Sequence, residues 1–494
     1  MKKAITAAIT LIATTAFCFN LEKKEFLHYD YIKITTTNNI TNLYMVVMKD
    51  GVEIPDLLGR VKILPKVNKS NSIFIFVPTY GIKDGEYEVC IYDSEKEIFR
   101  EKIFFLSRQQ AHLKEPLKVL TFEENMDIRL LFLESKSKGK SFKSYKVSAE
   151  EIKKVMDEMK LNTFLMLGGQ TTLLKDENNI WFPRVISNVT VLKYLKEKGI
   201  QVGAYVMCFL TIGQNKENSF KGYKPNLVYD NGNIYENYKY TSITSTKRIK
   251  DIIDILSYLG SKEYIDFLGI DFIRVGDYGG LELLPDFYEE VLENVDLSEF
   301  GLTDIKDKSI KGLSKIIFLN PNLKKLFKWY QSVRVGRIIK EIKDFLRKRG
   351  INKPLIAFML GWEAGREHGQ DLYMFRDAGV DYSFYMLYEF YSDEMFEKAG
   401  KFYLREIYNL DTNIVFGNIV DVILNKGKVS PLDNFQNRII KFISEFSYFV
   451  PNGFFIHDLY RILKGRKGDY STDDWINSVR RISELMDNLK ESDE

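Results

Sequence analysis

Residues 247–274 read KRIKDIIDILSYLGSKEYIDFLGIDFIR, and this stretch contains the unit whose repetition decides the fold. Its first half, Lys247–Leu259, has apolar residues at helical spacing and is typical of an amphipathic helix. Its second half, Ile265–Ile273, is an apolar run of strand length. A helix that leads into a strand buried on both faces is typical of a parallel sheet covered by helices.

The same alternation extends from about residue 115 to the end of the chain. Seven further apolar runs of strand length are Ile128–Leu133, Thr163–Leu167, Val202–Phe209, Leu355–Leu360, Tyr382–Tyr388, Asn413–Val420 and Gly453–Ile456. Further amphipathic segments are Ala149–Met159, Val189–Lys198, Val335–Arg349, Glu394–Tyr408 and Thr472–Leu489. Eight strands predict a closed (β/α)8 TIM barrel over residues 115–494, because an open doubly wound sheet usually has fewer strands and a Gly-rich phosphate loop.

Residues 20–108 have a different pattern, made of short segments that alternate between apolar and polar residues. Tyr31–Thr35 and Ser72–Val77 alternate in this way, and the turn at Lys83–Gly85 is followed by another alternating run. The sequence shows no convincing helix there. We therefore expect a small Ig-like or fibronectin-like β-sandwich, which either serves as a spacer or binds sugar directly.

The first 19 residues are typical of a signal peptide. Lys2 and Lys3 precede the apolar run Ala4–Ala13, and small residues follow it. The run is short for a transmembrane helix, which needs about 20 residues, although an uncleaved anchor is an alternative. A lipoprotein site is disfavoured because Phe17 precedes Cys18. We expect a secreted or cell-envelope protein with no stable membrane span beyond this segment.

Composition excludes several classes of function. The chain has 494 residues with 45% hydrophobic and 28% charged, which is enough for a large core. Its 71 basic and 68 acidic residues leave a net charge of +3, so we expect no nucleic-acid partner. The four histidines lack metal-ligand spacing, and we expect neither metal nor cofactor. Cys90 and Cys208 lie in apolar strands and are expected to be buried free thiols.

Two long connections follow the third and fourth predicted barrel strands. They span residues 211–246 and 276–334, and the first is rich in Asn, Tyr, Gly and Lys. Both leave the carboxyl ends of strands, where barrel active sites lie. Long loops at this end often form the walls of a binding site.

Asp271 interrupts the apolar strand Ile265–Ile273 close to its carboxyl end. A carboxylate in this position is costly to bury unless it is paired or hydrogen-bonded. Asp271 is therefore either a catalytic group or one half of a structural ion pair. A period of two places Asp271 and Ile273 on one face and Arg274 on the other, so a direct pair with Arg274 is not assured.

The segment Asp266–Arg274 resembles the strand-four signature of a glycosyl-hydrolase-like barrel family, known as DUF187 or glycoside hydrolase-like 10. That signature is approximately Asp-Gly-(Ile/Val)-His-(Phe/Leu)-Asp-(Tyr/Phe)-(Ile/Val)-Arg. Asp266 and Asp271 match its two aspartates, whereas Phe267 and Gly269 replace its Gly and His.

Three further stretches agree with the family in order, although each is weak alone. They are Phe327–Tyr330, the segment Gln370–Tyr388 with Tyr385 in place of a proline, and Gly453–Ile456. The resemblance covers most of the barrel. It implies a TIM barrel with glycoside-hydrolase-like character, and it supports the fold more than the activity.

Cleavage of a glycosidic bond requires two carboxyl groups. Glu363 follows the fifth predicted strand beside Trp362, whose ring can exclude water and raise the pKa of the carboxyl. We expect Asp271 to be the nucleophile or base and Glu363 the general acid, with Glu389 after the sixth strand as its substitute. The alternatives are a solvated loop residue for Glu363 and a helix N-terminal residue for Glu389.

Other residues near the predicted mouth are candidates for binding substrate. Arg274 is expected to orient a carboxylate or bind substrate, while Trp362 and Tyr388 are expected to stack on sugar rings. Tyr205 and Asp266 are candidate hydrogen-bonding residues. Weaker candidates, each also explained by a structural role, are Glu134, Gln170, His457 and Asp458.

The sequence thus predicts a secreted glycoside hydrolase that acts on extracellular or cell-surface polysaccharide. One alternative is a carbohydrate-binding barrel without hydrolysis, in which the two acids are too far apart or one is blocked by Arg or Lys. Another is an envelope-associated structural protein held by an uncleaved N-terminal helix.

Overall fold

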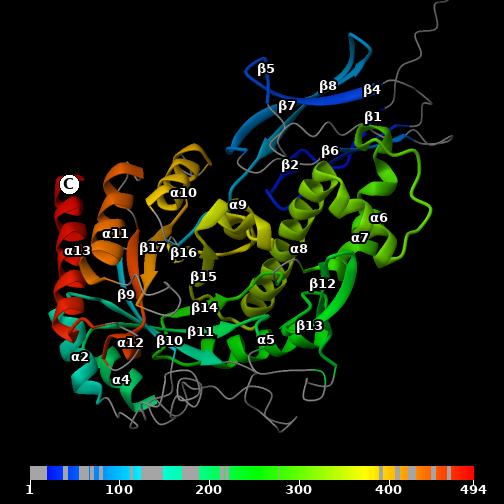
Figure 1. Cartoon of the computed structure of the whole chain (residues 1–494). Coiled ribbons are helices and arrows are strands. Elements are labelled where there is room, and N and C mark those ends of the chain that lie inside the picture. Colours follow the sequence, from blue (N-terminus) through cyan, green and yellow to red (C-terminus); the bar gives the residue numbers. More distant parts are fainter. Residues whose placement is uncertain are drawn as a thin grey trace, which may run out of the picture.

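The structure is a computed structural model of the chain, and Figure 1 shows its arrangement. It describes residues 19–36, 43–54, 66, 72–76, 82–111, 115–123, 148–169, 189–211, 216, 222–276, 279–388, 393–406, 412–420, 430–446, 452–463 and 469–493. Small sheets are formed by residues up to Phe105, and a closed barrel begins at Leu117. No helix among these residues has both the length and the apolar character required to span a membrane.

The barrel consists of eight strands, and each is parallel to both of its neighbours. In chain order they are β9 (Leu117–Phe122), β10 (Thr163–Gly169), β11 (Gln201–Met207), β14 (Phe267–Asp271), β15 (Leu355–Leu360), β16 (Tyr382–Met386), β17 (Ile414–Ile419) and β18 (Gly453–His457). The ring closes where β18 pairs with β9. The prediction of a mixed α/β fold with an eight-stranded parallel barrel is confirmed.

The first strand was predicted wrongly. It is β9 at Leu117–Phe122, whereas the predicted run Ile128–Leu133 lies outside the described residues. The polar residues of β9 obscured its strand pattern in the sequence, but in the structure their side chains have partners. Lys118 reaches Asp487 with a 2.8 Å contact between Nζ and Oδ1, and the Thr121 hydroxyl donates to the carbonyl of Ile456 at 3.3 Å.

Helices cover the barrel, and the six predicted amphipathic segments are all helical. They are α2 (Ala149–Glu158), α4 (Val189–Glu197), α5 (Thr246–Gly260), α8 (Pro321–Lys348), α10 (Asp393–Glu406) and α13 (Thr472–Asp493). The others are α6 (Leu284–Glu290), α7 (Ile310–Leu319), α9 (Leu372–Ala378), α11 (Arg438–Lys441) and α12 (Leu459–Leu463). The short 3-10 helices are η2 (Leu281–Leu283), η3 (Leu292–Asn294), η4 (Leu297–Phe300) and η5 (Trp362–His368), and the π-helical segments are η6 (Pro431–Asn437) and η7 (Phe442–Phe446).

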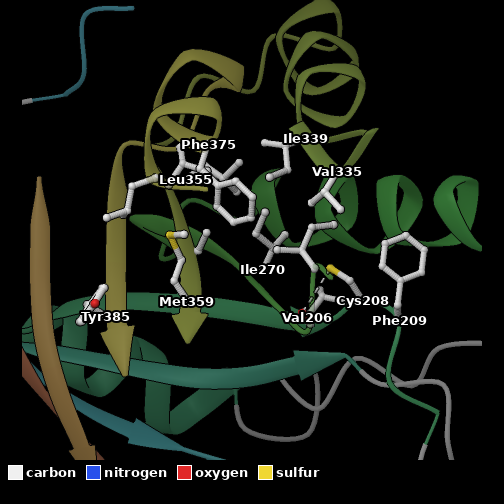
Figure 2. Packing of buried hydrophobic residues seen from close by; sticks show 14 of the residues in the cluster. Val206, Cys208, Phe209, Ile270, Val335, Ile339, Leu355, Met359, Phe375 and Tyr385 are labelled. Atoms are coloured by element: carbon white, nitrogen blue, oxygen red, sulfur yellow. Dashed lines mark hydrogen bonds between the residues drawn. The ribbon is translucent and has the colours of Figure 1, made fainter. Parts of the chain in front are cut away.

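Alternation along the strands divides the barrel into two cores. Side chains facing outward pack under the helices, and Figure 2 shows Val206 of β11 and Ile270 of β14 in one cluster with Val335 of α8. Side chains facing inward form a separate cluster rich in aromatic rings, namely Tyr205, Phe267, Phe358, Tyr382, Phe384 and Phe455. The barrel is therefore a filled core that opens only at its ends. Cys208, after β11, is a buried free thiol, as is Cys90.

The long connections carry additional elements beside the carboxyl end of the barrel. The first contains the antiparallel hairpin of β12 (Pro225–Asp230) and β13 (Asn233–Thr241), and the second contains α6 and α7. Tyr240 of the hairpin packs against the inward-facing cluster. The hairpin therefore borders the barrel mouth.

The residues before the barrel form two small sheets with a shared core. The strands are β1 (Phe19–Leu21), β2 (Glu25–Phe26), β3 (Ile32–Thr36), β4 (Leu43–Lys49), β5 (Val52–Glu53), β6 (Ser72–Phe76), β7 (Gly85–Asp93) and β8 (Lys96–Phe105). They are ordered β1-β3-β6 and β2-β8-β7-β4-β5, and all pairs are antiparallel except β2 with β8. Ile34, Phe74 and Phe105 meet between the sheets. The Ig-like or fibronectin-like class stays a prediction.

These sheets rest on α9 of the barrel, as Figure 1 shows. The buried His28 ring places Nδ1 2.5 Å from Oδ2 of Asp377 and Nε2 2.7 Å from the carbonyl oxygen of Ile82. Beside it, Arg376 donates to Asp84 at 3.2 Å. Buried charged contacts thus tie the N-terminal sheets to the barrel.

Candidate functional site

Polar side chains gather where the parallel strands end. Glu123 follows β9, Asp271 ends β14, Tyr388 follows β16 and His457 ends β18. Tyr205 lies deeper, in the middle of β11. These positions continue the inward-facing rows of their strands, so the side chains face the opening of the barrel.

These groups also influence one another electrostatically. Burial raises the pKa of the Tyr205 phenol well above its usual value, and the charges of Glu123 and Asp271 add to this effect. Burial likewise raises the pKa of Tyr388, again with contributions from Asp271 and Glu123. The ring of Tyr388 also lies 5.9 Å from that of His457.

Asp271 is the most unusual carboxyl group of this cluster. Asp271 is buried, with 8% of its surface exposed, and its Oδ1 accepts a 2.7 Å hydrogen bond from the amide of Phe272. Burial raises the pKa of Asp271 to about 6, although the positive charge of Arg274 opposes this rise. The charge of Glu123 raises it further. A carboxyl with this pKa exchanges its proton close to neutral pH, as general acids and bases do.

The backbone turns sharply directly after Asp271. Phe272 has a φ of 49°, in the left-handed region that bulky residues rarely adopt. Its ring packs against the inward-facing cluster, and the Arg274 guanidinium lies over that ring at 4.5 Å from the centroid. Ile273 instead belongs to the outer core.

This turn corrects the prediction made from a period of two. Asp271 and Ile273 lie on opposite sides of the barrel wall, because alternation ends at the left-handed residue Phe272. Arg274 is brought to the mouth rather than to the far face. Among the described residues, Arg274 makes no ion pair with Asp271, yet it exerts the largest charge effect on that carboxyl.

The pKa of Glu123 is shifted in the opposite direction to that of Asp271. The two carboxylate oxygens of Glu123 lie 3.1 Å from Nε2 of His457 and 3.0 Å from Nη2 of Arg461. Burial alone would raise the pKa of Glu123, but the His457 ring and the Arg461 guanidinium outweigh it and leave the pKa below its usual range. Asp458 completes the network, because its carboxylate accepts a 3.0 Å hydrogen bond from the amide of Glu123. Glu123 is therefore an ionised carboxylate.

Tyr205 occupies space that a glycine provides. A Cβ added to Gly269 would lie 2.5 Å from the Cβ of Tyr205, so no larger residue fits at position 269 without a shift. This accounts for Gly269 where the resembling family has His. The Tyr205 hydroxyl is fully buried, and no described residue hydrogen-bonds to it.

The structure does not bring Asp266 to this cluster. Asp266 precedes β14 at the opposite end of the barrel, where Oδ2 accepts a 2.9 Å hydrogen bond from the amide of Val202. Its other oxygen lies 2.5 Å from Nζ of Lys196. These contacts give it a structural role, and the predicted role in substrate binding is not supported by its position.

For five predicted residues the structure does not describe the side chain. Trp362 and Glu363 begin η5 directly after β15, at the same end of the barrel as Asp271, but the positions of their side chains lie outside the described structure. Glu389, Glu134 and Gln170 lie outside the described residues altogether.

The sequence reasoning missed Glu123 and Arg461. Glu123 continues the alternation of Val119 and Thr121, and this signal would have identified it had β9 been recognised. Arg461 carries no signal of its own, since it lies in the short helix α12 and its place at the site follows from its ion pairs with Glu123 and Asp458. Among the described residues, no group of three or more His, Cys, Asp or Glu is arranged to hold a metal ion.

Comparison with known proteins gives only distant likenesses. No family model matches the sequence, and no curated protein matches it. Among solved structures, the β-galactosidase of Rahnella sp. R3 is 10% identical with a TM-score of 0.49, over 77% of this chain and 57% of that one. The GH36 α-galactosidase of Geobacillus stearothermophilus is 10% identical with a TM-score of 0.40, over 93% of this chain and 63% of that one.

An α-amylase of Geobacillus thermoleovorans is also 10% identical, with a TM-score of 0.40 over 76% of this chain and 80% of that one. This chain thus spans less than two thirds of the length of the two galactosidases. The geometry of the barrel mouth, rather than these likenesses, supports the function proposed below.

Proposed function

We propose that the protein is an exported glycoside hydrolase that cleaves O-glycosidic bonds in extracellular or cell-surface polysaccharide. The observation that carries this proposal is Asp271, a buried carboxyl at the barrel mouth whose pKa is raised to about 6. Carboxyl groups with separated pKa values at the carboxyl end of a barrel are what acid-catalysed glycoside cleavage requires. The signal-peptide pattern of the first 19 residues supports export.

The electrostatics favour a different division of roles from the one expected from the sequence. A pKa of about 6 keeps much of Asp271 protonated at mildly acidic pH, which suits the group that protonates the leaving oxygen. We therefore assign Asp271 as the general acid. Glu123 is unsuited to attack a sugar because His457 and Arg461 occupy both of its oxygens.

The second carboxyl group of the reaction is proposed to be Glu363. It follows β15, the strand next to β14, and Glu389 after β16 is its substitute. A separation of about 5–5.5 Å from Asp271 would give retention of configuration, and about 6.5–9.5 Å would give inversion. Trp362 and Tyr388 are proposed to stack on sugar rings.

The test is product release from a panel of bacterial and plant polysaccharides by the wild type and by Asp271→Asn. We expect the variant to lose activity by at least about a hundredfold, because it cannot transfer a proton. The matched control is Asp266→Asn, the same substitution at the other end of β14, which we expect to retain activity. Equal activity of Asp271→Asn and wild type would move the site away from β14.

A second candidate function is a carbohydrate-binding barrel that does not hydrolyse. The observation that favours it is the ion pair of Glu123 with Arg461, because a site carboxylate blocked by arginine cannot react. Glycan binding by the wild type without product release from any bound polysaccharide would establish this alternative.

A further inference from the structure

Arg274 stands out among the arginines near the barrel mouth because no described residue forms an ion pair with it. Arg461 is paired with Glu123 and Asp458, and the buried Arg248 donates to the carbonyl oxygens of Met207 and Cys208. Arg274, by contrast, makes no ion pair or hydrogen bond with any described residue. Its one specific contact is with the ring of Phe272.

The contact with Phe272 positions the guanidinium over an aromatic ring without using its N–H donors. The ring lies 4.5 Å from the guanidinium carbon, and the ring itself is held against the inward-facing cluster of the barrel. A stacked guanidinium keeps its N–H groups free for paired hydrogen bonds to a planar anion. Arg274 is therefore a donor at the barrel mouth whose N–H groups no described residue occupies.

Asp271 does not form an ion pair with Arg274 in this structure. No ion pair connects the two described side chains, and the carboxyl is partly neutral near its raised pKa of about 6. Both groups nevertheless face one space, since the charge of Arg274 is the largest charge effect on Asp271. An anion bound to Arg274 would lie beside the reacting carboxyl.

We infer that the substrate is an acidic polysaccharide, and that Arg274 binds a carboxylate or sulfate group on a sugar next to the cleaved bond. This inference rests on the proposed function and names its substrate class. A bound anion would also neutralise the charge that opposes the raised pKa of Asp271. The substrate would thereby help the acid to keep its proton.

The test measures binding to matched pairs of glycans by titration calorimetry with the Asp271→Asn variant, which does not consume them. Uronate-containing oligosaccharides are compared with the same chains after carboxyl reduction, and sulfated ones with their desulfated forms. We expect the acidic member of at least one pair to bind at least about tenfold more tightly, as hydrogen bonds to charged groups provide. Which kind of pair shows this preference identifies carboxylate or sulfate as the group.

A second substitution assigns the preference to Arg274. Arg274→Gln is expected to abolish it, and Arg274→Lys to retain part of it, because lysine keeps the charge but loses the paired donors. The control is Arg349→Gln, since Arg349 also stacks on a phenylalanine, at 4.4 Å from Phe345, but lies before β15 at the other end of the barrel. That variant should keep the preference. Raising the salt concentration provides a measurement without any Arg274 variant, since it should weaken binding of the acidic members only.

Equal binding of both members of every pair, no binding of any acidic member, or a preference that survives in Arg274→Gln would each overturn the inference. The outcome for the hydrolase proposal is separate. Release from neutral polysaccharides that Asp271→Asn loses would retain the hydrolase and reject the acidic substrate. Acid-selective binding that depends on Arg274 without release by the wild type would retain the inference and reject hydrolysis.

Discussion

At the scale of single residues, the contrast between Asp271 and Glu123 is the feature from which the chemistry follows. Both are buried carboxyl groups at the barrel mouth, yet burial dominates for the first, whereas His457 and Arg461 dominate for the second. The pKa values of two like groups are thus shifted in opposite directions by their surroundings.

This contrast predicts how activity depends on pH. A general acid works only while it is protonated, so kcat/KM should fall as the pH rises through about 6, the pKa of Asp271. Arg274→Gln removes the charge that lowers this pKa, so the descending limb of the profile should move to higher pH. The measurement is a pH–rate profile of both proteins. A limb with a midpoint near 6 that instead rises with pH would assign Asp271 as base or nucleophile.

Glu123 gives a prediction about stability. Replacement by Gln leaves His457 and Arg461 without their carboxylate, and breaking such a buried network costs about 3 kcal/mol. The pKa of Glu123 is lowered in the folded state, so its stabilisation is present at neutral pH and is lost as the pH falls toward that lowered pKa. Urea unfolding at pH 7 measures the loss. Glu484→Gln, which breaks an exposed pair with Lys160, is the control and should be close to wild type.

At the scale of elements, most of the barrel could be predicted because the hydrophobic period and the length of each segment indicated the same type of element. β15 was predicted at its observed bounds, and α2 and α5 were predicted to within a residue. β9 was missed because Lys118 and Thr121 make it look polar, although the first reaches an ion pair and the second a backbone carbonyl. Such partners come from distant parts of the chain and leave no local signal.

The candidate site was predicted less completely than the barrel. Asp271, Arg274, Tyr205 and Tyr388 could be named as candidates because strand ends in a barrel converge on one opening. The orientation of Arg274 was not predictable, since it depends on one left-handed residue at Phe272. Asp266 was expected to bind substrate because it matches a motif, but a match to a motif does not show at which end of the strand a residue lies.

The close fit between β11 and β14 gives a prediction at this scale. Gly269→Ala places a methyl group against Tyr205, and overpacking of this kind costs about 1–3 kcal/mol. It should also displace Tyr205 from the mouth. Thermal unfolding and product release measure the two effects. Unchanged stability would show that the two strands separate more easily than their packing indicates.

At the scale of the whole molecule, the N-terminal sheets and the barrel are connected through buried charge. The ring of His28 faces two acceptors, the Asp377 carboxylate and the carbonyl oxygen of Ile82. His28→Ala leaves Asp377 without this partner, and we expect a loss of about 2 kcal/mol. Lys23→Ala removes an exposed ion pair of the same sheets with Asp30 and should have little effect. Equal unfolding midpoints for His28→Ala and wild type would show that the His28 contact does not stabilise the protein.

The left-handed residue at Phe272 determines how compactly the site is written in the gene. Four consecutive codons, for Asp271 through Arg274, specify a proton donor, the turn after it and an anchor for charge, while the rest of the barrel forms the walls of the site. Diversification of that tetrapeptide alone would therefore alter reactivity and charge preference together. Asp271 and Arg274 both face the opening because Phe272 has a left-handed φ. A substitution at position 272 that disfavours this φ would therefore remove the proton donor and the charge anchor at once.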